Sequence, residues 1–424
     1  MNTVGAPTGA GAMKRRLGVF DAVVIGLGSM IGAGIFAALG PAAGAAGSGL
    51  LLALALAAVV AYCNATSSAR LAALYPQSGG TYVYGRERLG DFWGYLAGWA
   101  FVVGKTASCA AMAITVGAYL WPGQTHAVAV AAVVALTAVN YAGVHKSALL
   151  TRVIVAIVLA VLAAVAVTAL AFAGADTLRL DIGVDATAGG VLQAAGLLFF
   201  AFAGYARIAT LGEEVRDPGR TIPRAIPVAL GITLGVYTLV AVAVLTVLGP
   251  VALADATAPL SDAVQAAGAG WLVPMVRAGG AVAALGSLLA LILGVSRTTL
   301  AMARDRHLLH TLSAIHPRHG VPHRAELAVG TVVALLAATT DLRGAIGFSS
   351  FGVLTYYAIA NACAWSLAEG EGRPYRLVPV IGLSGCATLA LALPLGTVIS
   401  GAAVLTLGTA VYFLRKVRTN ASRH

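Results

Sequence analysis

The sequence predicts a polytopic α-helical membrane protein. Of its 424 residues, 59% are hydrophobic and only 10% are charged, whereas soluble domains contain about 45–50% apolar and about 25% charged residues. Apolar runs close to the roughly 20 residues that a spanning helix needs recur along the whole chain. Basic residues gather in the short loops between these runs, which is the positive-inside pattern. The three observations together favour lipid as the solvent of a single membrane domain.

Taken in order, the apolar runs predict twelve membrane-spanning helices. Their expected spans are residues 18–43, 48–72, 89–121, 127–144, 150–174, 189–214, 226–249, 271–303, 325–340, 344–368, 376–393 and 396–414. The expected domain organisation is a disordered cytoplasmic N-terminus (1–16), one transmembrane transporter domain (17–415) and a cytoplasmic tail (416–424). Within the domain we expect repeat one at 17–174, repeat two at 189–368 and two extra helices at 376–414.

The distribution of basic residues predicts the orientation. Of the 27 basic residues, three fall inside apolar runs, three fall in loops on the outer side, and all others fall in loops on the inner side. The six exceptions are Lys105, Arg207, Arg297, Arg179, Arg277 and Arg343. We therefore expect a multi-pass protein of the cytoplasmic membrane with both termini in the cytoplasm. The net charge of +11 belongs to these loops, so we expect no nucleic-acid partner.

Two predicted helices, the first and the sixth, are interrupted by small residues. The first contains GLGSMIGAGIF (residues 26–36) and the sixth contains FFAFAGYAR (residues 199–207). Interrupted helices at corresponding positions of two halves indicate an inverted-repeat transporter. Because the two lie five helices apart, each half has five helices, an odd number, and the two halves have opposite topologies.

The glycines of the first interruption suggest a binding site made of main-chain groups. Each glycine costs about 1 kcal/mol relative to alanine in a regular helix. If the helix unwinds, the freed N–H and C=O groups at membrane depth must line a cavity or meet a polar ligand. The half-helix that begins near Gly32 would favour a carboxylate, and free carbonyls would suit an ammonium. The alternative, with about equal weight, is close helix packing through Gly28 and Gly32.

Five separated segments resemble the amino acid–polyamine–organocation (APC) transporter superfamily, in the order of that family. They are GSMIGAGIF (28–36), SGGTY (78–82), FFAFAGY (199–205), EEVRDPGRTIPRAI (213–226) and AMARD (301–305). The resemblance implies an all-α fold with a five-plus-five inverted repeat, broken first and sixth helices and two extra helices. It also implies amino acid transport by alternating access, with an amino acid as substrate and the lipid bilayer as surroundings.

The resemblance also implies substrate-binding residues. The main-chain N–H groups of Gly32, Ala33 and Gly34 would bind the substrate carboxylate. Carbonyls near Met30, Phe200 and Ala203 would bind its amino group. Phe200 and Phe202 are candidates for an aromatic gate, although ordinary packing explains each phenylalanine equally well. The expected pocket walls are Ser108, Ala111, Tyr205 and Tyr356, which lean toward a small or neutral substrate.

Lys105 lies near the middle of the predicted third helix, where an ionisable side chain suggests a function. Burial disfavours the charged form of a lysine, so Lys105 could release and regain a proton during transport. Many APC members carry a lysine on the fifth helix, at the position that matches Val158 here. A static ion pair or a lysine hydrogen-bonded to a carbonyl is an equally weighted alternative.

Arg207 and Glu214 are spaced seven residues apart, so on one helix they would share a face. They could form a charge network that moves at the inner gate, or a permanent pair, which we favour. Arg297, late in the eighth helix, is expected to extend to the inner membrane surface.

No cofactor or metal site is predicted. Ser287 and Ser296 are the only serines of the eighth helix and do not form a clear ligand set, so proton coupling is favoured over sodium coupling. The histidines between residues 307 and 323 lack regular ligand spacing. The expected function is therefore a permease acting by proton-coupled symport or exchange, and the pattern specifies no oligomeric state. A membrane-embedded enzyme and a channel are the alternatives; an enzyme needs more polar groups within the spans, and a channel usually shows a polar stripe.

Overall fold

The computed structural model describes residues 17–77, 79–143, 148–172, 176–212 and 214–421. In this part of the chain every regular element is a helix, apart from one isolated bridge that pairs Leu17 with Val215. The α-helices are α1 (Val19–Met30), α2 (Ala33–Ala37), α3 (Leu39–Ala46), α4 (Leu50–Leu74), α5 (Thr81–Leu89), α6 (Asp91–Leu120), α7 (Thr125–Tyr141), α8 (Ala148–Phe172), α9 (Ala188–Phe202), α10 (Ala206–Ala209), α11 (Pro218–Asp255), α12 (Pro259–Ala266), α13 (Val273–Arg304), α14 (His323–Thr339), α15 (Leu342–Trp365), α16 (Leu377–Ala392) and α17 (Leu395–Ala421). Short 3₁₀ helices cover Gly47–Gly49, Pro122–Gln124, Thr177–Leu180, Ala203–Tyr205, Gly270–Leu272, His310–Ser313 and Glu369–Glu371.

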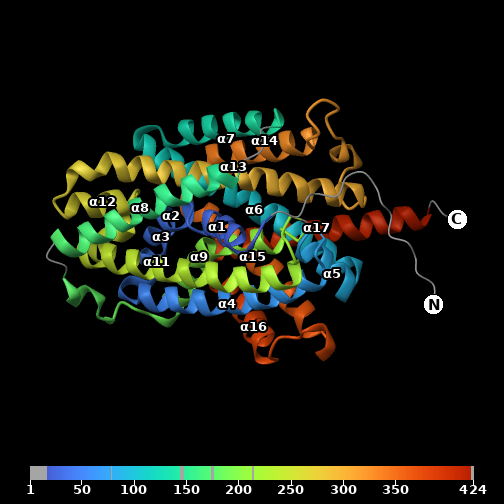
Figure 1. The fold of residues 1–424 in the computed structure, drawn as a ribbon, viewed down its shortest axis with the longest axis horizontal. Coiled ribbons are helices and arrows are strands. Elements are labelled where there is room, and N and C mark those ends of the chain that lie inside the picture. The colour runs from blue at the N-terminus through green and yellow to red at the C-terminus, as the bar shows by residue number, and fades with distance from the viewer. Residues whose placement is uncertain (1–16, 78, 144–147, 173–175, 213, 422–424) are drawn as a thin grey trace.

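The long helices run roughly along the longest axis of the molecule, and the C-terminal end of α17 lies at one end of the bundle (Figure 1). We call this the terminal end. Within the described residues, nine helical segments are long and apolar enough to cross a membrane. The other three predicted spans coincide with α14, α15 and α16; α14 has 17 residues and α16 has 16, slightly less than a spanning helix usually needs.

The first predicted helix is broken, as the glycines indicated. It ends as α1 at Met30 and resumes as α2 at Ala33, and Ile31 and Gly32 between them have non-helical dihedral angles. Helix α3 follows α2 directly after Ala38. The break lies in the interior of the bundle, because Met30 and Ala33 are both buried.

The sixth predicted helix is broken too, but it ends earlier than expected. Helix α9 passes through the 3₁₀ turn Ala203–Tyr205 into the short α10, which ends at Ala209. The Thr210 hydroxyl donates to the Arg207 carbonyl at 2.8 Å and closes this last turn. The expected helical face shared by Arg207 and Glu214 is therefore wrong, because Glu214 lies in the loop beyond the helix.

Gly90 separates α5 from α6, and α6 corresponds to the predicted third helix. The φ of 99° at Gly90 lies in the left-handed region that favours glycine, so the chain turns sharply between Leu89 and Asp91. A polar network ties α4 to α15: the Asn361 amide donates to Asn64 Oδ1 at 2.6 Å, and Ser67 Oγ donates to Asn361 Oδ1 at 2.7 Å. Such buried polar contacts hold helices together in lipid, where the hydrophobic effect does not.

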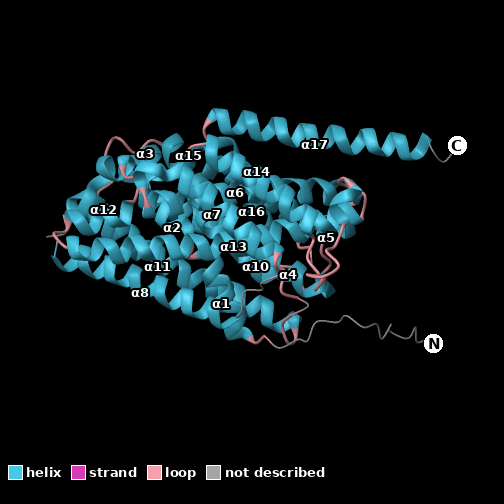
Figure 2. Ribbon diagram, turned by 90° about the horizontal axis from the view of Figure 1, so that it is seen from above, coloured by secondary structure: helices cyan, strands magenta, loops and turns pink. Residues whose placement is uncertain are grey.

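Helix α17 lies along the outside of the bundle, apart from the tightly packed centre (Figure 2). Leu395, Ile399, Leu407 and Leu414 are large apolar side chains of this helix that remain exposed. The other helices surround a core that is rich in alanine, valine and leucine, and the two breaks lie within it.

Candidate functional site

A cavity of about 170 Å³ lies at the centre of the bundle. This is an order of magnitude more than the roughly 15 Å³ that one water molecule needs, so the cavity has room for a small solute. Its lining comes from α1, α4, α5, α6, α10, α13 and α15 and from the end of α9. Along α13 the lining continues from Ser287 to Ala301, close to the end of this helix at Arg304, so the cavity extends toward the C-terminal end of α13.

Tyr237 of α11 joins the two broken segments. Its hydroxyl oxygen lies 2.5 Å from the Met30 carbonyl oxygen and 3.0 Å from the Ala201 carbonyl oxygen. Both carbonyls belong to the segments whose backbone groups were expected to be free. A hydroxyl carries one proton, so it donates to one of these carbonyls at a time.

Glycines allow the broken segments to approach each other closely. A Cβ on Gly34 would lie 2.6 Å from Ala201 Cα, and a Cβ on Gly204 would overlap the Ser29 carbonyl. A Cβ on Gly32 would overlap the hydroxyl of Ser287 on α13. The glycines therefore serve close packing, and they also let the backbone leave the helix at Gly32; the two alternatives considered for them are compatible.

Gly32, Ala33 and Gly34 lie at the start of α2, and no side chain caps this helix. Met30, Gly32, Ala33 and Gly34 are not among the residues that line the cavity, whereas Ser29 just before the break is.

Lys105 of α6 lines the cavity and is only 6% exposed. Its Nζ donates to the Ala203 carbonyl at 3.3 Å, and the Tyr357 hydroxyl donates to the same oxygen at 3.4 Å. The sequence singled out both Lys105 and Ala203. The structure brings them together, and the lysine occupies the carbonyl that was expected to bind the substrate amino group.

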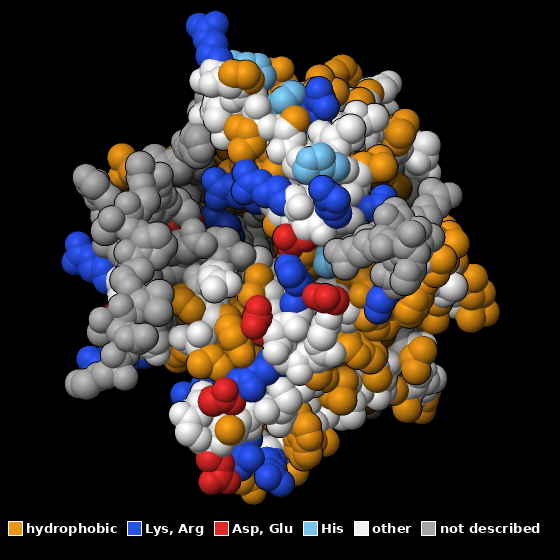
Figure 3. Space-filling view, turned by 90° about the vertical axis from the view of Figure 1, so that its right-hand side faces the viewer, with side chains coloured by type: hydrophobic (Ala, Val, Ile, Leu, Met, Phe, Trp, Pro, Cys, Tyr) orange, Lys and Arg blue, Asp and Glu red, His pale blue; other side chains and the backbone are white. Residues whose placement is uncertain are grey.

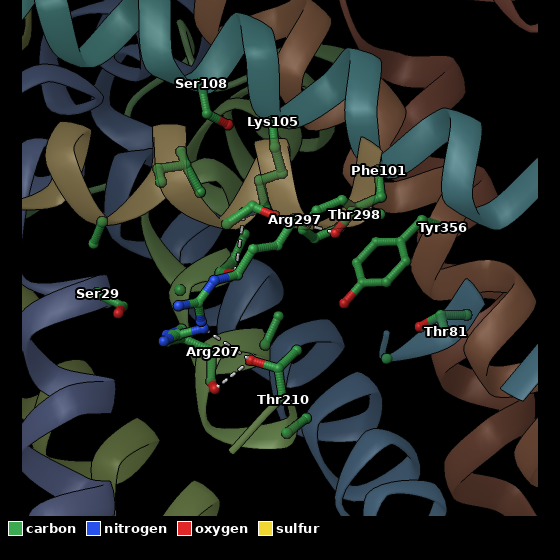
Figure 4. A pocket seen from close by; sticks show the side chains of 18 of the residues that line it. Ser29, Thr81, Phe101, Lys105, Ser108, Arg207, Thr210, Arg297, Thr298 and Tyr356 are labelled. Carbon is green, nitrogen blue, oxygen red and sulfur yellow. Dashed lines mark hydrogen bonds between the residues drawn. The ribbon is translucent and has the colours of Figure 1, made fainter. Parts of the chain in front are cut away.

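Arg207, Arg297 and Glu214 all line the cavity. Arg207 donates to Thr210 Oγ1 at 3.4 Å, and the charges of both Glu214 and Arg297 act on it. Figure 4 shows Arg297 reaching from α13 into the cavity toward Arg207. Arg297 is exposed and lines the cavity; its expected extension to the inner membrane surface stays a prediction.

The predicted aromatic residues separate into two groups. Phe200 and Tyr356 line the cavity. Phe202 is fully buried against Tyr237, with ring centroids 5.2 Å apart, and Tyr205 stacks on Tyr357 at 5.1 Å. Phe202, Tyr205 and Ala111 are not among the residues that line the cavity.

Sequence reasoning did not find Tyr237 or the cavity position of Arg297. Tyr237 lies in an ordinary apolar run and no motif marks it. Arg297 did carry a signal, because it is one of three basic residues inside apolar runs. Because Arg297 is far from the sixth segment in the sequence, the sequence alone did not reveal that it lies near Arg207.

Basic side chains border a hollow in the face of the terminal end (Figure 3). Among the residues the structure describes, no group of three or more His, Cys, Asp or Glu side chains is arranged to hold a metal ion. The histidines 316, 319 and 323 instead pack around the ring of Tyr141.

Comparison with known proteins decides the family. The family model described as "Amino acid permease" matches residues 17–416. The chain belongs to this family. An uncharacterized transporter of Mycobacterium tuberculosis is 75% identical to this permease over 411 residues, which cover 97% of this chain and 93% of the relative.

Two more distant relatives have more specific names. A branched-chain amino acid permease of Bacillus subtilis is 28% identical, over 97% of this chain and 95% of its own length. The human cationic amino acid transporter 4 is 29% identical, over 82% of this chain and 58% of its own length. The resemblance to the APC superfamily is therefore confirmed: this permease is a multi-pass membrane transporter and not an enzyme.

Proposed function

We propose that this permease carries an amino acid across the cytoplasmic membrane by alternating access, as a proton-coupled symporter or an exchanger. The observation that carries the proposal is the pair of broken helices beside one central cavity. Each break frees backbone groups at membrane depth, where they are tolerated only if they meet a cavity or a polar partner. The ligand then binds near the breaks, at the middle of the bundle.

The proposed topology has twelve spans, with α14, α15 and α16 added to the nine apolar segments. The first five and the next five form the inverted repeat (17–174 and 189–368), and α16 and α17 are the two extra helices. Both termini are cytoplasmic in this arrangement, so the terminal end faces the cytoplasm and the cavity is accessible from the inside.

In the proposed site, the N–H groups of Gly32, Ala33 and Gly34 bind the substrate carboxylate at the start of α2. The carbonyls of Met30, Phe200 and Ala203 bind the ammonium. Because Tyr237 and Lys105 donate to Met30 and Ala203, they must yield these acceptors when the substrate arrives. Phe200 and Phe202 form the gate, with Phe200 at the cavity and Phe202 behind it.

The test of transport is uptake of labelled amino acids into liposomes that contain the purified permease. We expect saturable, stereoselective uptake or exchange, supported by a pH gradient and independent of sodium. A non-saturating flux would indicate a channel and would contradict the carrier mechanism.

Lys105 is the proposed coupling group, because it is the buried cation that contacts the broken sixth segment. Replacing it by alanine removes the proton-carrying amine. We expect Lys105→Ala to abolish the pH dependence of uptake while substrate exchange continues. Intact pH-dependent uptake in this variant would exclude Lys105 from coupling.

A further inference from the structure

The charges that line the central cavity are unevenly balanced. Among the described residues, its lining contains three cations and one carboxylate, which are Lys105, Arg207, Arg297 and Glu214. Clefts lined mainly by one sign of charge attract solutes of the opposite sign and repel solutes of the same sign. A cationic substrate side chain would therefore enter an unfavourable field.

The two guanidinium groups lie close enough for their charges to interact. Arg207 is half-buried and Arg297 is exposed, and Figure 4 shows Arg297 directed into the same part of the cavity. Arginine stays protonated in proteins, so this repulsion persists at every physiological pH. In the part of the chain that the structure describes, no carboxylate forms an ion pair with either one.

A carboxylate placed between the two groups would remove the repulsion. The planar donor fork of arginine matches the two oxygens of a carboxylate, and such charge-assisted hydrogen bonds are about twice as strong as neutral ones. Glu214 lines the cavity, and the buried Glu326 of α14 lies near enough to Arg297 for their charges to interact. Two carboxylates therefore face three cations, and one positive charge is left unbalanced. The lining thus has both the charge and the donor geometry that an anionic group requires.

We propose that the permease prefers amino acids with an acidic side chain, and that Arg207 and Arg297 are the specificity-determining residues that bind the side-chain carboxylate. The proposal rests on the proposed transport function and adds a substrate class to it. Neutral amino acids rank second, and cationic amino acids are excluded by the three cations. The specificity thus differs from that named for the human relative.

The first experiment measures competition in liposomes containing the unmodified permease. Uptake of a labelled amino acid is challenged with glutamate, aspartate, alanine, leucine, lysine and arginine. We expect the acidic pair to compete at the lowest concentrations and the cationic pair not to compete. Lysine or arginine competing as well as glutamate would overturn the substrate class, whereas no uptake of any amino acid would overturn the transport function itself.

The second experiment compares Arg207→Gln and Arg297→Gln with Arg220→Gln. The Arg220 side chain is 78% exposed in α11 and does not line the cavity, so it is the matched control. We expect each cavity substitution to weaken glutamate competition roughly 10- to 100-fold, the usual effect of losing a hydrogen bond between charged groups. Alanine competition and the control variant should stay nearly unchanged. Equal loss for glutamate and alanine would mean that the arginines are structural.

Two further measurements keep the test decisive. Arg297→Lys retains the charge but not the planar donor fork, so it should keep a weaker preference for glutamate over alanine. This variant tests the proposal even if the glutamine variant does not fold, and a complete loss of the preference with the charge retained would contradict the charge argument. Thermal stabilisation of the purified permease by glutamate is compared with stabilisation by sodium chloride, because an inorganic anion has the same charge as a carboxylate. If sodium chloride stabilises the permease as much as glutamate does, the arginine pair binds a free inorganic anion, and the proposal is overturned.

Discussion

At the scale of single residues, Gly32 in the first break is important because it has no Cβ, and a neighbouring side chain fills the space that a Cβ would take. Ser287 Cβ would lie 2.9 Å from a Cβ added to Gly32, closer than such atoms approach each other, and the Ser287 hydroxyl would overlap it. The next neighbour of that Cβ, the Ala283 carbonyl oxygen, would be at 3.6 Å, an ordinary contact. The steric conflict is therefore confined to one side chain.

Because of this confinement, we predict that Gly32→Ala lowers the thermal unfolding midpoint of the purified permease and that Ser287→Gly relieves the effect. In the Ser287→Gly background, adding Gly32→Ala should cost little, since the overlapping atoms are gone. The measurement is a double-mutant cycle of unfolding midpoints. The same cost in both backgrounds would show that the glycine is needed for its backbone conformation instead.

Tyr237 offers a second residue-scale test. Tyr237→Phe leaves the buried Met30 and Ala201 carbonyls without their hydroxyl donor, and an unpaired buried acceptor costs about 1–3 kcal/mol. We expect a lower free energy of unfolding in detergent. The exposed Tyr62 supplies the control, and a Tyr62→Phe variant that is as destabilised as Tyr237→Phe would contradict this role.

At the scale of elements, the loop before α9 is fastened to the end of the first segment. Asp185 Oδ1 accepts from Ser48 Oγ at 2.7 Å, and Oδ2 accepts from the Ser48 N–H at 2.9 Å. These two bonds hold the pKa of Asp185 below its ordinary value of 3.8. A carboxyl group with a lowered pKa stabilises the fold above its ordinary pKa, and this contribution is lost as the pH falls through the lower folded value.

We therefore predict that Asp185→Ala destabilises the permease at neutral pH and that its difference from the unmodified protein shrinks below about pH 3.8. Unfolding midpoints between pH 3 and 7 test this. Asp181, an exposed carboxylate of the same loop, is the control. A difference that stays constant to pH 3 would mean that the Asp185 bonds do not depend on its charge.

The sequence predicted these elements well where the signal was local. Apolar runs located the long helices, and the glycines around Gly32 and Gly204 located the two breaks. The end of the sixth segment was predicted too late, because the residues after Ala209 still look helical in composition. Gly212 belongs to a loop so close to Pro76 that a Cβ would overlap the Pro76 carbonyl, and one sequence does not reveal such a long-range approach.

The candidate site was predictable only in part for a similar reason. Lys105 and Arg207 stood out because charges are costly in an apolar run. The contacts of Lys105 with Ala203 and of Tyr237 with Met30 join helices far apart in the chain. Their partners depend on how the helices pack, and a pattern within one segment carries no information about that.

At the scale of the whole molecule, the proposed orientation can be tested with introduced cysteines. The four native cysteines are all buried, so they need not be removed. We predict that a membrane-impermeant maleimide labels Val184→Cys in intact cells and labels Tyr375→Cys only after permeabilisation. Both positions are exposed, in loops expected on opposite sides. The reverse pattern would invert the proposed topology.

The pairing of Leu17 with Val215 has a practical consequence for the whole protein. The Leu17 N–H donates to the carbonyl of Glu214 at 3.2 Å, and the Glu214 side chain lines the cavity. If the cavity carries the substrate as proposed, a tag or fluorescent reporter fused directly before Leu17 begins beside a cavity-lining residue, and we expect it to slow uptake in the liposome assay. The far end of α17 projects away from the bundle (Figure 2), and a fusion there leaves the entrance unobstructed.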